Sequence, residues 1–439
     1  MSKHLRVAIV GAGPAGIYAG NILKREYDNV SIDLFDSLPA PYGLIRYGVA
    51  PDHPRIKGIV NSLHEMLDEG TIRFVGNVTF GRDLTLADIK AHYHAVIFAT
   101  GAIKDADLDI PGVELDGSFG AADFVSWYDG HPDFPRTWPL NAKEVAVLGN
   151  GNVALDVARV LAKHADDLLS TDIPANVYEG LKASPVTDVH VFGRRGPGSI
   201  KFTPIELREL GEVEDVDIVV YEEDFPEGWD TESHEGVTNQ HKVMARIMQA
   251  WRDNPQTGSS RRLHLHFFHR PVEIIGENGK VTGMKFERTR SNGDGTVSGT
   301  GEMREFEVQA VYRAIGYFGS ELPDVPFDAK HGVIKNLAGR VSDGVYATGW
   351  IKRGPVGLIG HTKSDATETI QCLVEDAAQL ADPTSQANIF EVLDSRGVAY
   401  TTWNGWLKLN AHEQALGQAV DRERVKVVDR EEQVAISRA

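Results

Sequence analysis

Short apolar runs that end in a glycine recur along the chain and set its pattern of hydrophobic and polar positions. One run covers residues 7–10, in LRVAIVGAGPAG, and another begins at Glu144, in EVAVLGNGNVALDVARVL. The segments AVIFATG (95–101), VYRAIGY (311–317) and VYATGW (345–350) have the same form. Near-continuous apolar strands are typical of parallel sheets that are covered on both faces. The pattern therefore predicts an α/β fold.

The first run is followed by a glycine turn. Gly11, Gly13 and Gly16 come directly after the strand, a helix is expected at about 14–25, and VSIDLFDS supplies a second strand that ends at Asp36. An isolated GxGxxG sequence also fits a tight structural turn. Here the strand, turn, helix and second strand with a terminal acid together indicate a dinucleotide site, because the acid can accept hydrogen bonds from ribose hydroxyls.

A second turn of the same kind follows the strand that begins at Glu144. Gly149 and Gly151 occupy the first two glycine places, and Ala154 takes the third small-residue place. Such a turn brings a backbone close to a pyrophosphate and presents the N–H groups of a helix N-terminus. The chain is thus predicted to hold two dinucleotides.

The two turns differ in the charge at the end of the strand that follows. In the second unit a strand that begins at Val189, in VHVFGRRGPG, is expected to end at Arg194 and Arg195. Guanidinium groups match phosphate oxygens, whereas Asp36 would repel a 2′-phosphate and suits an unmodified ribose. Two adjacent arginines also fit a solvated turn, but their place at a strand end after a glycine turn favours the 2′-phosphate of NADP.

Two different dinucleotides suggest a converter between kinds of electron carrier. NADPH delivers two electrons as a hydride, while many carriers accept one electron at a time, and a flavin can do both. FAD is therefore expected at the first site and NADP at the second.

Composition limits the other possibilities. The single cysteine, Cys372, excludes a CxxC redox pair and an iron–sulfur cluster held by this chain, and no metal site is predicted. A net charge of -18 over 439 residues disfavours nucleic acid as a partner. The N-terminus superficially resembles a signal peptide, but its apolar run breaks at the turn glycines, and no run approaches the roughly 20 apolar residues of a membrane helix. We expect a cytoplasmic protein without membrane insertion.

The order of the runs predicts one nucleotide domain interrupted by another. The expected fold class is α/β with two Rossmann-like dinucleotide-binding domains, the NADP domain (105–318) inserted into the FAD domain (1–104 and 319–439). The stretch SNGDGTVSGTGE (291–302) is expected to be a loop between the strand-like segments VTGMKFERT and EFEVQAVYRAI.

Longer motifs resemble the adrenodoxin-reductase-type ferredoxin–NADP reductases. They are APYGLIRYGVAPDHPRIK (40–57), GNGNVALDVARVL, GRRGP, FTPIELREL and GWIKRGPVGLIGHTKSDA, in the order of that family. The resemblance spans nearly the whole chain. It implies a flavoprotein with noncovalent FAD that exchanges electrons between NADPH and a ferredoxin-type iron–sulfur protein.

The resemblance also implies which residues contact FAD. They are Gly11, Gly13, Ala15, Gly16, Asp36, Leu44, Val78, Trp350, Gly357, Leu358 and Ile359. Trp350 is also compatible with an aromatic that closes the core, but the flanking GW and GPVG sequences favour contact with the flavin.

For NADP the resemblance implies a second set. The pyrophosphate would lie against Asn150, Gly151, Asn152 and Val153, and the 2′-phosphate against Arg194 and Arg195.

Three further residues are implied near the reacting rings. Glu206, in IELREL, resembles the acid near the nicotinamide, and His53 with Asp156 would organise the flavin and nicotinamide pockets. His53 also fits a residue that caps or spaces the DHP turn. Hydride transfer requires no protein acid or base, so positioning is the expected contribution of all three.

Docking of an acidic ferredoxin on a chain of net charge -18 requires a local basic face. The candidates are Arg208 and the pair Lys242 and Arg246, which are four residues apart on a helix predicted for HKVMARIMQAW. The same pair is equally compatible with a solvated helix face.

Other protein classes share the nucleotide folds. A self-contained disulfide reductase of the thioredoxin reductase kind needs a redox cysteine pair, which one cysteine cannot supply. An NADPH-oxidising subunit of a larger complex, like the small chain of glutamate synthase, typically adds a cysteine-rich segment that is absent here, yet it stays as the alternative. Motifs alone do not exclude a nonenzymatic nucleotide sensor.

Overall fold

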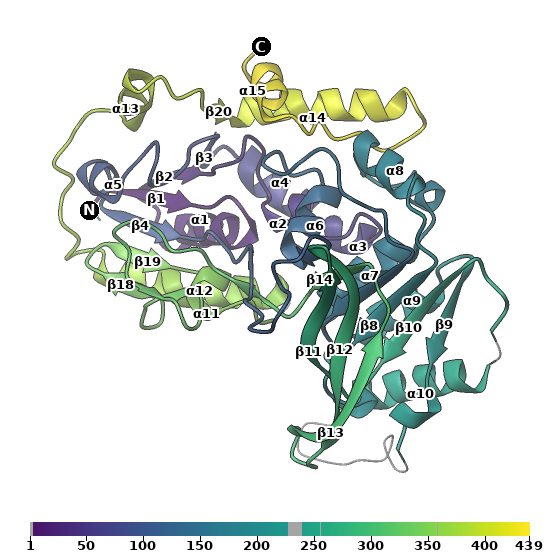
Figure 1. Ribbon diagram of the computed structural model, residues 1–439. Coiled ribbons are helices and arrows are strands. Elements are labelled where there is room, and N and C mark those ends of the chain that lie inside the picture. The colour runs from purple at the N-terminus through teal and green to yellow at the C-terminus, as the bar shows by residue number, and fades with distance from the viewer. Residues whose placement is uncertain (1–2, 227–238, 255, 358) are drawn as a thin grey trace. The chain divides into compact units, whose positions relative to one another are not determined.

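A computed structural model describes residues 3–226, 239–254, 256–357 and 359–439 (Figure 1). The chain divides into two compact units. The first comprises Met1–Lys104, Asp129–Asp133 and Tyr317–Ala439, and the second comprises Asp105–Tyr128 and Phe134–Gly316. The second unit is therefore inserted in sequence within the first.

The first unit is built on a seven-stranded sheet in the order β18-β19-β4-β1-β2-β3-β20. The five central strands are parallel, and the two edge strands pair antiparallel to their neighbours. The strands are β1 (Leu5–Val10), β2 (Val30–Phe35), β3 (Ile72–Gly76), β4 (Ala95–Phe98), β18 (Arg340–Ser342), β19 (Val345–Ala347) and β20 (Thr401–Thr402).

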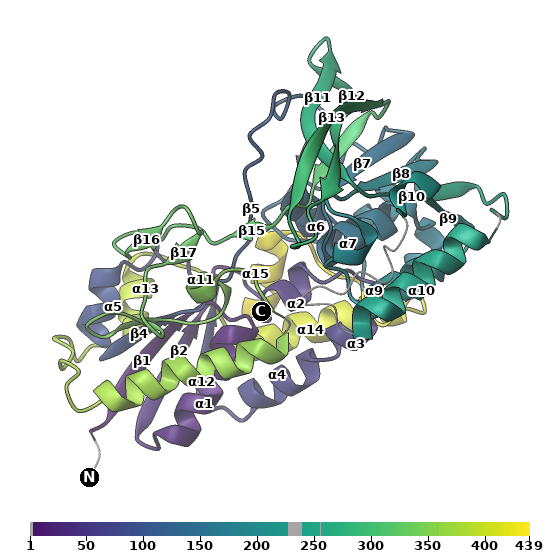
Figure 2. The same ribbon diagram turned by 90° about the horizontal axis from the view of Figure 1, so that it is seen from below.

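Helices cover both faces of this sheet, which explains why its strands are apolar along their length. On one face α1 (Pro14–Glu26) packs against α12 (Ile359–Asp376) and α4 (Val60–Asp68), and Figure 2 shows the three side by side. The other face packs against α5 (Leu86–His92) and α13 (Ile389–Ser395).

Further helices and short strands complete the first unit. They are α2 (Leu44–Tyr47), α3 (Pro54–Lys57), α11 (Trp350–Arg353), α14 (Trp403–Gln418), α15 (Arg430–Arg438), β15 (Tyr317–Phe318), β16 (Phe327–Asp328) and β17 (Val333–Ile334), with β5 (Lys104–Asp105) where the chain leaves the unit. A buried ion pair joins the C-terminal part to α2, because Arg46 donates to both carboxylate oxygens of Glu413 at 3.0 and 2.5 Å. Breaking such a pair leaves an uncompensated buried charge and costs about 3–5 kcal/mol.

The second unit is built on a parallel six-stranded sheet in the order β6-β14-β7-β8-β10-β9. Its strands are β6 (Ser118–Gly120), β7 (Glu144–Leu148), β8 (Asp188–Phe192), β9 (Val216–Val220), β10 (Arg261–His266) and β14 (Ala310–Arg313). Its helices are α6 (Ala121–Tyr128), α7 (Asn152–Ala162), α8 (Ala175–Lys182), α9 (Pro204–Gly211) and α10 (Asn239–Asp253), with short 3-10 turns at Ala165–Leu168, Pro197–Ser199 and Glu222–Asp224. The predicted α/β fold with an inserted second unit is confirmed.

A three-stranded antiparallel sheet also belongs to the second unit. It consists of β11 (His269–Glu277), β12 (Lys280–Ser291) and β13 (Val297–Phe306), and its Phe286 and Phe306 pack on Phe192 of the larger sheet.

The loop predicted over 291–302 is wrong except at 292–296. Ser291 pairs with Val297, and Thr289 pairs with Gly299, so most of the glycine-rich stretch is a strand of a hairpin. Its composition misleads because a partner strand supplies the hydrogen bonds that the small side chains do not.

None of the helices in the described ranges is long and apolar enough to span a membrane.

Candidate functional site

The first glycine turn joins β1 to α1. Gly11 has φ +111°, and a Cβ atom there would lie 2.4 Å from the carbonyl oxygen of Ala99. A Cβ atom at Gly16 would lie 1.9 Å from the carbonyl oxygen of Gly11, so the helix packs on the strand only without a side chain. Gly13 precedes α1, and no side chain in the described part of the chain caps the first turn of that helix. Its N–H groups are therefore available to an anion.

Asp36 fastens the end of β2 to the glycine turn. Its two carboxylate oxygens accept hydrogen bonds from the backbone N–H groups of Ala12, at 2.7 Å, and Leu38, at 2.8 Å. Burial raises the pKa of Asp36 to about 6, although these two bonds and the charge of Arg430 act in the opposite direction. A carboxylate offers about four lone-pair positions, so two remain for ribose hydroxyls.

The segment before α2 folds back onto this turn. Tyr42, with φ +83°, donates its N–H to the carbonyl of Ala12 at 2.8 Å, and a Cβ atom at Gly43 would lie 3.0 Å from Cα of Gly13. Leu44 then begins α2 and is half-buried. The sequence motif had not indicated this close backbone approach.

Val78 lies beside Asp36. Its side chain is buried, and its N–H donates to the carbonyl of Asp36 at 2.8 Å. Val78 therefore lies, like Asp36, at the C-terminal end of β2.

Ala15 and Trp350 belong to elements that meet at Gly349. A Cβ atom at Gly349 would lie 2.6 Å from the Cβ of Ala15, and Trp350 follows as the half-buried first residue of α11. This contact brings the GW motif to the first turn of α1.

Asp365 holds that junction and was missed by sequence reasoning. Its carboxylate accepts the N–H of Gly349 at 2.5 Å and pairs with Nζ of Lys352 at 2.9 Å. The only sequence signal was its place in the GHTKSDA motif, which does not show what the side chain meets.

The GPVG segment is described in part. Gly357 is exposed with φ +87°, and α12 begins at Ile359. Leu358 and the side chain of Ile359 lie outside the described part of the structure.

His53 directly precedes α3 and is 4% exposed. Its N–H donates to the carbonyl of Ala50 at 3.1 Å, and its carbonyl accepts the N–H of Lys57 at 3.0 Å. These backbone bonds shape the DHP turn, and a role for the imidazole stays a prediction.

The second glycine turn joins β7 to α7. Gly149 has φ +153°, and a Cβ atom there would lie 2.3 Å from the carbonyl oxygen of Ala314 and 3.1 Å from the Cβ of Ala154. At Gly151 no described atom lies within 4 Å of a Cβ position, so this backbone borders open space. Asn152 Oδ1 accepts the N–H of Thr203 at 3.1 Å, and none of the described side chains caps the start of α7.

Asn150 carries the clearest sign of a missing ligand. Both polar atoms of its side chain amide are buried and have no hydrogen-bond partner among the described residues. Each unsatisfied buried group costs about 1–3 kcal/mol. The position between two turn glycines fits a ligand that both donates and accepts, as a dinucleotide does. Val153, predicted beside it, is half-buried in the first turn of α7.

Arg194 and Arg195 follow β8, which ends at Phe192 and not at the arginines as predicted. After the strand, Gly193 donates its N–H to the carbonyl of His266 at 2.9 Å and accepts the N–H of His269, the first residue of β11, at 3.0 Å. The carbonyl of Arg194 accepts from Thr289 Oγ1 at 2.6 Å. Arg194 is exposed and Arg195 half-buried, and within the described ranges neither guanidinium has an ion-pair partner. The backbone at Arg194 is thus held, while neither guanidinium is engaged by a carboxylate of the described residues.

Glu206 and Asp156 each have a neighbour in the second unit. The Thr203 hydroxyl donates to the buried Glu206 in the first turn of α9, and Arg159 donates to Asp156 at 3.0 Å along α7. Through its hydrogen bond with Thr203, Glu206 stabilises the N-terminus of α9.

The three predicted docking cations are exposed on two helices that pack together. Arg208 lies on α9, and Lys242 and Arg246 lie on α10 (Figure 2). No carboxylate among the described residues pairs with any of the three.

Comparison with known proteins agrees with the geometry. Residues 5–191 match the family model described as pyridine nucleotide-disulphide oxidoreductase. The chain is 37% identical to NADPH-ferredoxin reductase FprA of Mycobacterium tuberculosis, with 96% of each chain covered. It is 35% identical to the mitochondrial NADPH:adrenodoxin oxidoreductase of Bos taurus, with 98% of this chain and 92% of the relative covered.

A solved structure is similar over the full length. The structure of Mycobacterium tuberculosis FprA in complex with NADPH superposes with a TM-score of 0.93 at 36% identity, and all of both chains is covered.

Proposed function

The chain belongs to the family of adrenodoxin-reductase-type ferredoxin–NADP reductases, and from this premise we propose that it is an FAD-dependent oxidoreductase that transfers electrons between NADPH and a ferredoxin-type iron–sulfur protein. One observation carries the proposal: a buried acid closes the first glycine turn, whereas the second is followed by two guanidinium groups that have no ion-pair partner among the described residues. The first arrangement suits FAD and the second NADP.

The first unit would bind FAD, with the domain boundaries at 1–104 and 319–439. The N-terminal N–H groups of α1 after Gly13 face the pyrophosphate, and the spare lone pairs of Asp36 accept from the ribose. Leu44, Val78 and Trp350 line the pocket from the three segments that meet at this turn.

The second unit, 105–318, would bind NADP. The open backbone at Gly151 would lie against the pyrophosphate, and the unsatisfied side-chain N–H groups of Asn150 would donate to its oxygens. Arg194 and Arg195 hold the 2′-phosphate through charge-assisted hydrogen bonds.

Bound FAD supplies the chemistry, because a flavin takes a hydride from NADPH and passes electrons singly. The protein binds, orients and shields the reactants. His53, Asp156 and Glu206 are proposed as positioning residues, and Glu206 is already fixed by the Thr203 hydroxyl. The proposal places the protein in the cytoplasm, which supplies NADPH.

The function is tested on the purified protein. Denaturation should release FAD and not FMN, one equivalent of NADPH should bleach the flavin band without oxygen, and added ferredoxin should raise the rate of cytochrome c reduction. A colourless protein that cannot be reconstituted with FAD would contradict the proposal. Flavin reduction by NADPH without transfer to any ferredoxin or to ferricyanide would indicate a nucleotide sensor.

We further propose that the ferredoxin docks on α9 and α10 through Arg208, Lys242 and Arg246. A net charge of -18 gives no overall attraction to an acidic partner, so a local basic face must provide it. These cations have no carboxylate partner among the described residues, which leaves their charge available to a partner protein.

Charge reversal separates docking from chemistry. The double variant Lys242→Glu and Arg246→Glu should raise the KM for ferredoxin at least about fivefold at low salt and leave ferricyanide reduction unchanged. The effect should shrink in 1 M salt, where the Debye length falls to about 3 Å. The matched control reverses Lys280 and Arg290, two exposed cations of β12. Equal KM values in both double variants would rule out this docking face without touching the reductase assignment.

A further inference from the structure

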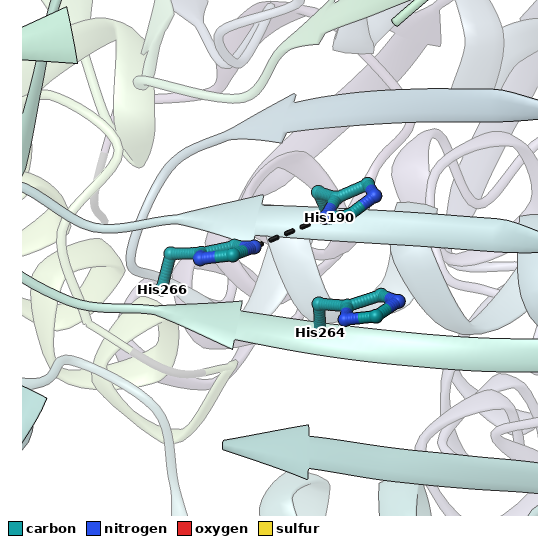
Figure 3. Close-up of side chains that lie close together, drawn as sticks. All are labelled: His190, His264 and His266. Carbon is teal, nitrogen blue, oxygen red and sulfur yellow. Dashed lines mark hydrogen bonds between the residues drawn. The ribbon is translucent and has the colours of Figure 1, made fainter. Parts of the chain in front are cut away.

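Three buried histidines lie together on one face of the six-stranded sheet. His190 of β8 pairs in register with His264 of β10, and His266 follows two residues later, so the three rings point to the same side (Figure 3). Their exposed fractions are 8%, 8% and 4%. One ring nitrogen from each lies within 4.8 Å of the other two.

A carboxylate sets the tautomer of one of these rings. His264 Nε2 lies 2.8 Å from Oδ1 of Asp188, and a neutral ring that is hydrogen-bonded to a carboxylate carries its proton on that nitrogen, so Nδ1 of His264 has the lone pair. Nε2 of His190 lies 3.4 Å from Oε2 of Glu144 and has no hydrogen-bond partner among the described residues.

The lone pairs meet donors inside the cluster. His264 Nδ1 lies 2.8 Å from the hydroxyl of Tyr221, and His190 Nδ1 lies 3.0 Å from Nε2 of His266. The His266 proton can move to its own Nδ1 without any change in net charge. His190 and His266 then each turn a lone pair toward the other, while the His264 ring is stacked on His190 with the ring centroids 4.2 Å apart.

We propose that His190, His264 and His266 bind a divalent cation of the zinc class. A neutral imidazole with a carboxylate on its other nitrogen is the usual ligand arrangement for such ions. Tetrahedral coordination at 2.0–2.1 Å places ligand nitrogens about 3.3 Å apart, close to the 3.0 Å between His190 and His266. Because His264 is stacked on His190, the proposed site requires the His264 ring to turn out of this stack to reach the same ion.

The surrounding charges suit a dication. Asp188 and Glu144 contribute two negative charges, and Arg262, which pairs with Asp188 at 2.6 and 2.8 Å, contributes one positive charge. The Tyr221 hydroxyl or a water supplies the fourth ligand.

The ion would have a structural role that is independent of electron transfer. It joins β8 to β10 and, through Tyr221, to the end of β9. The sequence predicted no metal site, because an HxH pair and a histidine 74 residues earlier become neighbours only through the strand register.

The test uses the full-length FAD-loaded protein, treated with EDTA, dialysed and titrated with Zn²⁺. We expect one Zn²⁺ per chain and a rise in Tm of about 5 °C or more at a hundredfold excess over Kd. Co²⁺ should bind with the same stoichiometry and give the intense visible bands of a tetrahedral nitrogen-ligated ion.

Variants assign the site. His190→Phe with His266→Phe keeps the aromatic stack on Phe192 and should abolish uptake, while Asp188→Asn should weaken Zn²⁺ binding about 10–100-fold. His331→Gln, at an exposed histidine, is the matched control and should bind as the wild type does. Less than one Zn²⁺ per wild-type chain, full uptake by the double variant, or only the pale spectrum of octahedral Co²⁺ in the wild type overturns the proposal.

Discussion

The two glycine turns have the same strand–turn–helix backbone. They differ in how much room they leave for a side chain and in the charge of the residues at the end of the next strand. In the first, a Cβ atom at the third small-residue position, Gly16, would lie 1.9 Å from a backbone oxygen. In the second, Ala154 fills that position, and its Cβ lies 3.1 Å from where a Cβ of Gly149 would be. The first turn is therefore tighter than the second by about the size of a methyl group.

This comparison indicates that the geometry of a glycine turn and its preference for a particular ligand depend on different residues. Both turns leave helix N–H groups uncapped for a phosphate. What distinguishes them is the next strand end, where Asp36 is buried and bonded and the two arginines are held only through their backbone.

Gly16→Ala should have the largest effect. The added methyl group meets the Gly11 oxygen, so the turn must open, with a loss of several kcal/mol of stability and of the bound flavin. Denaturant unfolding and the flavin absorbance of the purified variant measure both.

Gly151→Ala is the matched change in the second turn. Its Cβ position has no described atom within 4 Å, so stability should change by about 1 kcal/mol or less while NADPH binding weakens. Equal destabilisation by the two substitutions would remove the distinction between the turns.

Asp36→Asn tests the burial of the first strand end through pH. A folded-state pKa of about 6, raised by burial, means that ionisation of Asp36 costs stability as pH rises from about 4 to 6. The stability advantage of the flavin-free wild type over the variant should therefore fall by about 2 kcal/mol between pH 4.5 and pH 7. Urea unfolding across that range measures it, with the exposed Asp28→Asn as control. An advantage that grows with pH would show that the Ala12 and Leu38 bonds outweigh burial.

Replacing Arg194 and Arg195 by alanine tests the second strand end. Each charge-assisted bond to phosphate is worth roughly 1.5–3 kcal/mol, so the KM for NADPH should rise at least about tenfold and that for NADH should stay nearly unchanged. Steady-state rates with ferricyanide measure both. An equal loss of activity with NADPH and with NADH would mean that the arginines support the fold.

Ala154→Gly should have the smallest effect on nucleotide binding. Glycine in the first turns of α7 costs about 1 kcal/mol through backbone entropy and leaves the ligand contacts in place. We expect the Tm to fall slightly and the KM for NADPH to stay unchanged. A loss of stability comparable to that of Gly16→Ala would contradict the ranking.

The strands and turns were predictable because apolar runs, glycines and strand-end charges are local signals. The hairpin at 292–296 was not, because the pairing of Ser291 with Val297 depends on a partner strand. The contacts of Asp365 and the histidine cluster likewise depend on segments far apart in the sequence. The positions of the two turns could therefore be predicted from the sequence. The contacts of individual side chains could not, because they depend on strand register and helix packing.

The most direct test of two separate nucleotide sites is calorimetric titration of the FAD-loaded protein with NADP⁺ and NAD⁺. The account predicts one NADP⁺ bound per FAD, at least about tenfold tighter than NAD⁺, with the flavin retained throughout. Displacement of FAD by NADP⁺, or equal affinity for the two nicotinamide dinucleotides, would contradict it.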